Sequence, residues 1–232
     1  MILAVAATEF EMSPLTRLLA AGREKGSADV PASPCCTLIT GVGPVETTLR
    51  LTRLLEGRDP RLDCVLNFGV AGAYVRETPG PAGNAGLLDL CLAERECLGD
   101  FGICYADRIE AFDDQLSGPV SFPLDQSLLS RAETILTRRG QAFRRGNFVT
   151  VSAASATQAR GQMLAARFGG LCENMEGAAV ARVCAEFSLP VLELRVVSNL
   201  VEDRDVSRWR LAAACQRAAE AAALLVRELE RT

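Results

Sequence analysis

Short apolar runs alternate with helix-like patterns along most of this chain. An uninterrupted apolar run bounded by glycine, proline or polar residues predicts a buried strand, and apolar residues repeated every three or four positions predict a helix. We expect strands near 1–7, 35–41, 63–69, 87–96, 146–152 and 190–198, and helices near 11–21, 44–56, 155–168, 176–188 and 206–230. This order predicts an α/β sandwich around a parallel or mixed sheet.

The intervening segments carry turn signals. Residues 77–86 are rich in glycine and proline and predict a loop, and 108–123 is expected to be irregular. At 232 residues the chain can bury one good core, so we expect a single domain spanning 1–232.

Composition narrows the possible partners. Apolar residues make up 49% of the chain, and the net charge is −4, which argues against a nucleic-acid surface. No apolar run reaches the roughly 18 residues that a membrane-spanning helix needs. The sequence therefore favours a small-molecule partner, with neither nucleic acid nor membrane.

Cysteine and histidine restrict the chemistry further. Nine cysteines are an odd number without a Cys-x-x-Cys pair, which predicts reduced core thiols in a cytoplasmic protein. Histidine is absent, which removes imidazole-based triads and the commonest zinc ligand. We expect no metal and no organic cofactor, and any catalysis must use carboxylates, amides and backbone groups.

Glu176 begins an otherwise small and apolar helical segment. Burying an unpaired carboxylate there would cost several kcal/mol or force it to protonate. A ligand would explain the charge, and a carboxylate can accept two adjacent hydroxyls such as those of a ribose. The alternative is an ordinary first-turn glutamate favoured by the helix dipole. Position alone leaves both interpretations open.

Other polar groups follow strands in the same way. Glu11 comes after the first expected strand, residues 69–72 end the third, and Ser198 and Asn199 end the last. Ligands of open α/β sheets bind beyond the carboxyl ends of strands, so we expect these groups to converge on one crevice with Glu176. The glycine turns do not match a dinucleotide fingerprint or a phosphate-binding P-loop.

Five segments together resemble the nucleoside phosphorylase and nucleosidase superfamily. They are 6–11, 41–43, 67–72, 174–179 and 195–199, and the most specific part is Met-Glu-Gly-Ala-Ala followed about twenty residues later by Arg-x-x-Ser-Asn. The resemblance implies a three-layer α/β/α sandwich with a central mixed sheet. It also implies that Glu176 holds the ribose hydroxyls, that Met175 lies under the sugar, and that the chain forms a homo-oligomer, a dimer or higher.

The same resemblance bears on whether phosphate or water attacks the sugar. Phosphorylases place a hydroxyl residue in the glycine turn, where this chain has Val70 followed by Ala71 and Gly72. An apolar side chain offers phosphate no hydrogen bond. Glu11 matches the carboxylate that activates water in the nucleosidases, and its charge would repel phosphate. Hydrolysis is therefore favoured.

The motif that ends in Ser198 and Asn199 bears on which purine base is bound. Adenine-specific relatives carry aspartate after the serine that matches Ser198, whereas this chain has Asn199. An amide can accept from a protonated N7 and donate to a 6-oxo group, which is the hypoxanthine pattern. The segment from Asn199 to Trp209 resembles the branch of the superfamily that hydrolyses futalosine.

Two departures from the superfamily pattern concern the base contacts. Ala153 and Ala154 replace a purine-stacking aromatic, and Asn174 replaces a second carboxylate before the methionine.

Three alternatives remain at this stage. A purine nucleoside phosphorylase would need a phosphate site built from Arg76 or Arg195. A methylthioadenosine nucleosidase is disfavoured by Asn199. A non-catalytic nucleoside-binding protein is disfavoured by Glu11.

Overall fold

The computed structural model describes residues 1–21, 35–57, 62–76 and 83–230. Within them lies a mixed eight-stranded sheet, which confirms the predicted α/β class. Its strands are β1 (Ile2–Ala6), β2 (Cys35–Ile39), β3 (Cys64–Tyr74), β4 (Leu90–Leu98), β7 (Ser121–Pro123), β8 (Arg144–Thr150), β9 (Gly170–Asn174) and β10 (Val191–Val201). A small separate sheet pairs β5 (Ile103–Cys104) with β6 (Ile109–Glu110).

The long strand β3 organises the sheet. Its first half pairs in parallel with β1, and β10 pairs in parallel along nearly its whole length. Near its end β3 also pairs antiparallel with β9. The remaining pairings run from β10 through β4 and β8 to β9, so these strands and β3 form a closed ring. The sheet therefore curls on itself, and the C-terminal half of β3 lies in this ring between β10 and β9.

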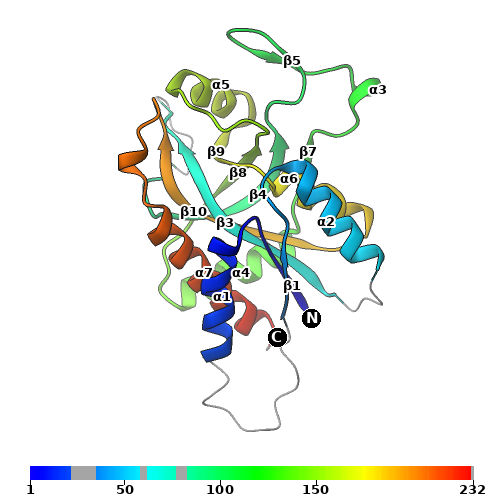
Figure 1. Cartoon of the computed structure of the whole chain (residues 1–232), viewed down its shortest axis with the longest axis vertical. Helices are drawn as coiled ribbons and strands as arrows, with labels where there is room; N and C mark the ends of the chain where they lie inside the picture. The colour runs from blue at the N-terminus through cyan, green and yellow to red at the C-terminus, as the bar shows by residue number, and fades with distance from the viewer. Residues whose placement is uncertain (22–34, 58–61, 77–82, 231–232) are drawn as a thin grey trace.

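Helices cover the sheet in two groups, as Figure 1 shows. One group is α1 (Glu9–Ala21), α4 (Gln126–Arg138) and α7 (Leu211–Leu229), in which α7 packs against both α1 and α4 over one apolar core. The other contains α2 (Pro44–Glu56) and α6 (Gly177–Glu186), which pack together over a second core. A smaller cluster lies under α5 (Gln158–Phe168). The short helix α3 (Asp114–Ser117) and the β5–β6 hairpin project beyond these layers.

The turn before α2 follows the sequence prediction. Gly41 and Gly43 adopt positive φ values of 81° and 91°, a conformation that favours glycine. Pro44 then occupies the first helical turn, where its missing N–H is no loss. This turn brings the backbone N–H of Gly43 to the buried Glu176 carboxylate at 3.0 Å.

Several predicted boundaries were wrong. Residues 67–72 lie inside β3 and not at its end, because the pairings with β10 and β9 extend the strand to Tyr74. The helix expected over 206–230 is broken into a 3₁₀ turn, η1 (Val206–Arg208), and α7. The backbone N–H of Arg210 leaves the helical pattern and donates to the Ser198 carbonyl at 2.7 Å.

The prediction also missed α4 and β9 entirely. Within 108–123 the structure adds β6, α3 and β7, all very short, and leaves the rest irregular as expected. Of the loop expected over 77–86, residues 77–82 lie outside the described residues, and 83–86 carry no helix or strand.

The cysteines behave as predicted. All are free, and most are buried, the exceptions being Cys36 and Cys104. Burial raises the pKa of the Cys184 thiol to about 12, so it stays a neutral core side chain. Within the described ranges, no helix combines the length and apolar character needed to cross a membrane.

Candidate active site

A pocket of about 460 Å³ opens beside the C-terminal half of β3. Every residue predicted for the site lines it except Ala153, namely Glu11, Val70, Ala71, Gly72, Ala154, Asn174, Met175, Glu176, Ser198 and Asn199. The volume falls in the range of small-molecule sites. The structure thus confirms the expected convergence of groups that lie far apart in sequence.

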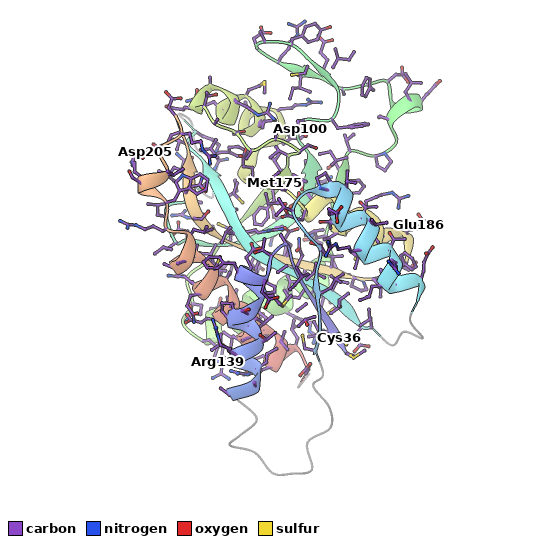
Figure 2. All side chains as sticks on the ribbon, in the orientation of Figure 1. Cys36, Asp100, Arg139, Met175, Glu186 and Asp205 are labelled. Atoms are coloured by element: carbon purple, nitrogen blue, oxygen red, sulfur yellow. The ribbon has the colours of Figure 1, made fainter. Side chains whose placement is uncertain are left out.

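Ala153 and Met175 differ in their placement. Ala153 is exposed and its backbone N–H donates to Asp100 at 3.2 Å, so the residue lies outside the pocket wall. Met175 is partly buried and lines the pocket. Figure 2 shows it near the centre of the view, close to the start of α6.

Glu11 is held by hydrogen-bond donors from the turn after β1 and from the middle of β3. Its Oε2 accepts from the backbone N–H and the hydroxyl of Thr8, at 3.1 and 2.8 Å. Its Oε1 accepts from the backbone N–H of Val70 at 3.1 Å. The side chain is only 5% exposed, although α1 begins at the surface. These contacts aim the carboxylate into the pocket and use donors that an anionic ligand would otherwise find there.

Gly69 makes this position possible. A Cβ atom built on it would overlap Glu11 Oε1 and lie 2.9 Å from an Arg195 guanidinium nitrogen. Glycine is therefore required by close approach of charged side chains and not by an unusual φ value.

Glu176 is buried at the N-terminus of α6, but its side chain does not cap that helix. Its Oε1 accepts from the Gly43 N–H at 3.0 Å, and its Oε2 lies 3.4 Å from the Arg195 guanidinium. Glu176 thus stands at the N-cap of α6, as the alternative interpretation expected, but its carboxylate bonds to other elements and does not cap the helix. The sequence analysis considered an unpaired buried carboxylate at Glu176, whereas the structure pairs it with Arg195 and the Gly43 N–H. Burial raises the pKa of Glu176, and Arg195 and Gly43 counteract that increase.

Arg195 is a buried cation that lines the pocket. It is 1% exposed, and its Nε donates to Glu193 at 2.9 Å. Burial alone would lower its pKa, but Glu193, Glu176 and Glu11 together raise it above the usual arginine value. The guanidinium thus stays charged, with Nε and Nη1 directed to carboxylates of the protein and Nη2 buried without a partner among the described residues.

Another buried carboxylate, Glu96, supports the start of α6. It accepts from Thr150 at 2.8 Å and from the Asn174 amide at 2.5 Å. Burial and the neighbouring Glu193 raise its pKa well above the usual glutamate value. A Cβ on Gly177 would overlap Glu96 and lie 2.7 Å from Glu193, so glycine lets both carboxylates approach the helix.

Asn174 is occupied by the protein. Its side-chain oxygen accepts from the backbone N–H groups of Glu176 and Gly177, at 2.9 and 2.7 Å, and its amide nitrogen donates to Glu96. It thereby satisfies the orphan donors at the N-terminus of α6. These contacts make Asn174 a positioning residue for Glu176 and leave its predicted role at the base without support.

Ser198 and Asn199 reach the pocket through a β-bulge. The register between β10 and β3 shifts between Val197 and Asn199, which turns the chain locally. The Ser198 hydroxyl then donates to the Asn199 side-chain oxygen at 2.8 Å. A Cβ on Gly72 would lie 3.1 Å from the Asn199 amide nitrogen, so this glycine makes room for the amide.

The sequence analysis missed other pocket residues. Glu173 and Ser155 form a hydrogen-bonded pair in the wall, and Arg204 lies with its guanidinium 4.9 Å from the Trp209 ring centroid. Thr8, Phe10, Val42, Val151, Leu211 and Cys215 complete the lining with Ala7. Glu173 adjoins the motif at 174–179, which could have signalled it, but β9 itself was not predicted.

Residues 25–231 match the family described as the phosphorylase superfamily. This chain belongs to that superfamily. A futalosine hydrolase from Streptomyces coelicolor is 34% identical over 199 residues, which cover 83% of this chain and 79% of that protein.

Two further proteins extend the comparison. A 5′-methylthioadenosine/S-adenosylhomocysteine nucleosidase from Staphylococcus haemolyticus is 26% identical over 72% of this chain and 70% of that protein. The structure of a futalosine hydrolase mutant of Helicobacter pylori superposes with a TM-score of 0.79 at 22% identity, covering 98% of each chain. The nucleoside phosphorylase-like fold is confirmed. The sequence relatives are named hydrolases and nucleosidases, which confirms the predicted class, an N-glycosyl hydrolase.

Replacing Gly69 by alanine should damage the site more than the fold. The added Cβ must displace the Glu11 carboxylate, and a misplacement of about 1 Å at a catalytic group can lower kcat by about 10²-fold. Steady-state hydrolysis and thermal unfolding measure the two effects. Gly86→Ala is the control, because its Cβ would meet no atom closer than 3.8 Å. A Gly69→Ala enzyme with wild-type kcat would contradict the assignment of Glu11.

Replacing Glu96 by glutamine should stabilise the protein increasingly as pH rises. The raised pKa of Glu96 means that wild-type stability is fully present below the ordinary glutamate pKa of 4.5 and declines above it. Glutamine can accept from Asn174 and donate to Thr150 without ionising. The Tm difference, variant minus wild type, should grow from about pH 4 to about pH 8. A flat or declining difference would contradict the raised pKa of Glu96.

Proposed function

We propose that this protein hydrolyses the N-glycosidic bond of futalosine, releasing hypoxanthine and dehypoxanthinyl futalosine in menaquinone biosynthesis. The observation that carries the proposal is the placement of Glu11 and Glu176 in one pocket, with the nearby anion-binding donors already taken by Glu11. The 34% identity to a futalosine hydrolase supports the choice of substrate.

The carboxylates of Glu11 and Glu176 still have acceptor positions that the protein does not use, and these positions define where the sugar would bind. Each carboxylate oxygen can accept about two hydrogen bonds. Glu176 uses one on each oxygen, for Gly43 and Arg195, so each oxygen can still accept one ribose hydroxyl. Glu11 uses one acceptor position of Oε1 for Val70 and can accept a water proton at the other.

Glu11 then acts as general base toward water at the anomeric carbon. Bond cleavage builds positive charge on the sugar, and the neighbouring carboxylates stabilise an oxocarbenium-like transition state. Glu176 fixes the ribose so that the carbon faces this water. Met175 and Val70 supply apolar contacts that keep other water away from the ring.

Phosphorolysis fits this site less well. Arg195 directs Nε to Glu193 and Nη1 to Glu176 and leaves only its buried Nη2 without a partner in the described part of the chain, and Arg76 donates to Asn84 and Gly83. The hydroxyl and N–H groups of Thr8 and the Val70 N–H point to Glu11. A phosphate at this position would meet a carboxylate where it needs donors, and repulsion would oppose its binding.

The purine side supports a 6-oxo base. Asn199 is neutral and presents an amide at the bulge, where an aspartate would suit the N7 and 6-amino group of adenine. The proposed partner is thus a nucleoside, bound without metal or organic cofactor. A cytoplasmic location and assembly into a homo-oligomer, a dimer or higher, stay predictions.

Hydrolysis should proceed without phosphate. Purified protein in phosphate-free buffer should release hypoxanthine from futalosine, followed by chromatography, because Glu11 activates water. A strict requirement for phosphate would refute hydrolysis. Inosine, methylthioadenosine and the 6-amino analogue of futalosine belong in the same panel. A higher kcat/KM for methylthioadenosine than for futalosine would assign the protein to the adenine-specific nucleosidases instead.

Replacing Glu11 by glutamine should lower kcat by about 10²–10⁴-fold, the usual contribution of a general base, while changing KM little. The amide keeps the shape of the side chain but cannot take a proton from water. Steady-state kinetics measure both constants. The matched control is Glu9→Gln, two residues away on an exposed position of α1. Unchanged kcat in Glu11→Gln would remove Glu11 from the mechanism.

A further inference from the structure

The proposed reaction needs a proton on the departing purine, and Asn199 cannot supply one. An amide can donate a hydrogen bond to the base, but it does not release a proton at accessible pH. We propose that Glu173 and Ser155 form the proton-donating pair on the purine side, with Glu173 as the proton source and the Ser155 hydroxyl as the relay. This inference rests on the proposed function.

The two side chains are in direct contact at the pocket wall. The Ser155 hydroxyl donates to Glu173 Oε2 at 2.7 Å, and Glu173 Oε1 accepts from the Ser155 backbone N–H at 2.8 Å. When Glu173 carries its proton, the bond between Oε2 and the serine oxygen runs in the opposite direction, from the carboxyl group to the hydroxyl. Both residues line the same pocket as Glu11 and Glu176. Glu173 is 6% exposed, whereas Ser155 is half-buried and stands closer to the open space. A proton leaving Glu173 for a ligand therefore passes most directly through the serine hydroxyl.

Strand register places this pair beside Asn199. Gly72 of β3 pairs with Glu173 of β9 on one side and with Asn199 of β10 on the other. Because Gly72 has no side chain, the two neighbours approach across it. A Cβ on Gly72 would lie 3.1 Å from the Asn199 amide nitrogen and 3.6 Å from Glu173 Cγ. Asn199 and Glu173 thus face one end of the pocket.

The surroundings of Glu173 favour a carboxyl group that retains its proton. Burial raises its pKa, and the Ser155 hydrogen bonds, the Tyr74 hydroxyl of β3 and Arg160 of α5 partly oppose that increase. Arg160 is itself paired with Asp100 at 3.2 Å, which reduces its effect on Glu173. On the β10 side the facing group is Asn199, which carries no charge.

The step balances in protons and electrons. As the N-glycosidic bond breaks, its electron pair moves to the purine, and a purine nitrogen takes the Ser155 hydroxyl proton. Ser155 takes the Glu173 proton at the same time, which leaves Glu173 as a carboxylate. Water adds hydroxide to the anomeric carbon and gives its other proton to Glu11. Exchange with solvent then restores both glutamates, and no oxidant or reductant is needed.

The test compares Glu173→Gln and Ser155→Ala with wild type over a range of pH. Glutamine keeps the contacts that hold the Ser155 loop but cannot ionise. For futalosine, Glu173→Gln should lower kcat by about 10²–10⁴-fold, the usual contribution of a general acid. Wild-type kcat/KM should decline as pH rises through the pKa of Glu173, and this alkaline decline should be absent in the variant. Ser155→Ala should also lower kcat, with KM changed less.

A substrate whose leaving group needs no proton separates chemistry from positioning. With 4-nitrophenyl β-D-ribofuranoside, both variants should hydrolyse at rates within about threefold of wild type, because nitrophenolate departs unprotonated. Equal losses on both substrates, or an alkaline decline that persists in Glu173→Gln, would overturn the proposal. If wild type does not accept the nitrophenyl riboside, the pH profile with futalosine decides alone.

Two controls keep the outcomes distinct. Glu186→Gln removes a surface carboxylate of α6 that is 67% exposed, does not line the pocket and lies well away from Met175 in Figure 2, and the variant should match wild type on futalosine. Thermal unfolding identifies a variant that fails to fold, in which case the other variant carries the test. Wild type that cleaves no nucleoside would defeat the proposed function, whereas active wild type with fully active Glu173→Gln would defeat only this inference.

Discussion

The site depends on the burial of one guanidinium. Arg195 is almost without solvent contact, and such a charge is tolerated only with counter-charges and hydrogen bonds at close range. Glu193 and Glu176 provide them, and Gly69 leaves the space in which Glu11 and Arg195 approach. The carboxylates at the sugar end are therefore oriented before any ligand arrives, which is the condition for electrostatic stabilisation of a developing cation.

The same arrangement separates the two halves of the proposed reaction. Negative charge gathers on the Glu11 and Glu176 side, where the sugar becomes positive. On the other side, Asn199 and the Ser155–Glu173 pair face a purine that becomes negative and requires a proton. Glycines at 69 and 72 sit between these groups on β3, and each leaves room for side chains from neighbouring elements. The curl of the sheet thus brings the carboxylates that would stabilise a positive sugar and the groups that would protonate the purine into one pocket.

Prediction from the sequence succeeded where neighbouring residues alone determine the structure. The helix over 44–56 was predicted at its observed bounds, because Pro44 and the preceding glycines mark its start and its apolar spacing is regular. It failed at α4 and β9. β9 is a five-residue strand that begins at a glycine, and its pairing with β8 and β3, which residues distant in sequence provide, defines it. Glu173 was missed for the same reason, and Asn174 received a ligand role because its capping contacts are invisible without α6 in place.

By itself the sequence determined the fold class, the superfamily and ten residues of the pocket wall, since motif residues such as Glu11, Glu176 and Asn199 carry their chemistry wherever the chain places them. Only the tertiary structure decided how those residues are charged and partnered. Whether a carboxylate is free, ion-paired or protonated depends on burial and on neighbours from other strands. Arg195 beside Glu176, Glu193 beside Glu96, and Glu173 beside Ser155 are contacts between segments that the linear order keeps apart or leaves unoriented.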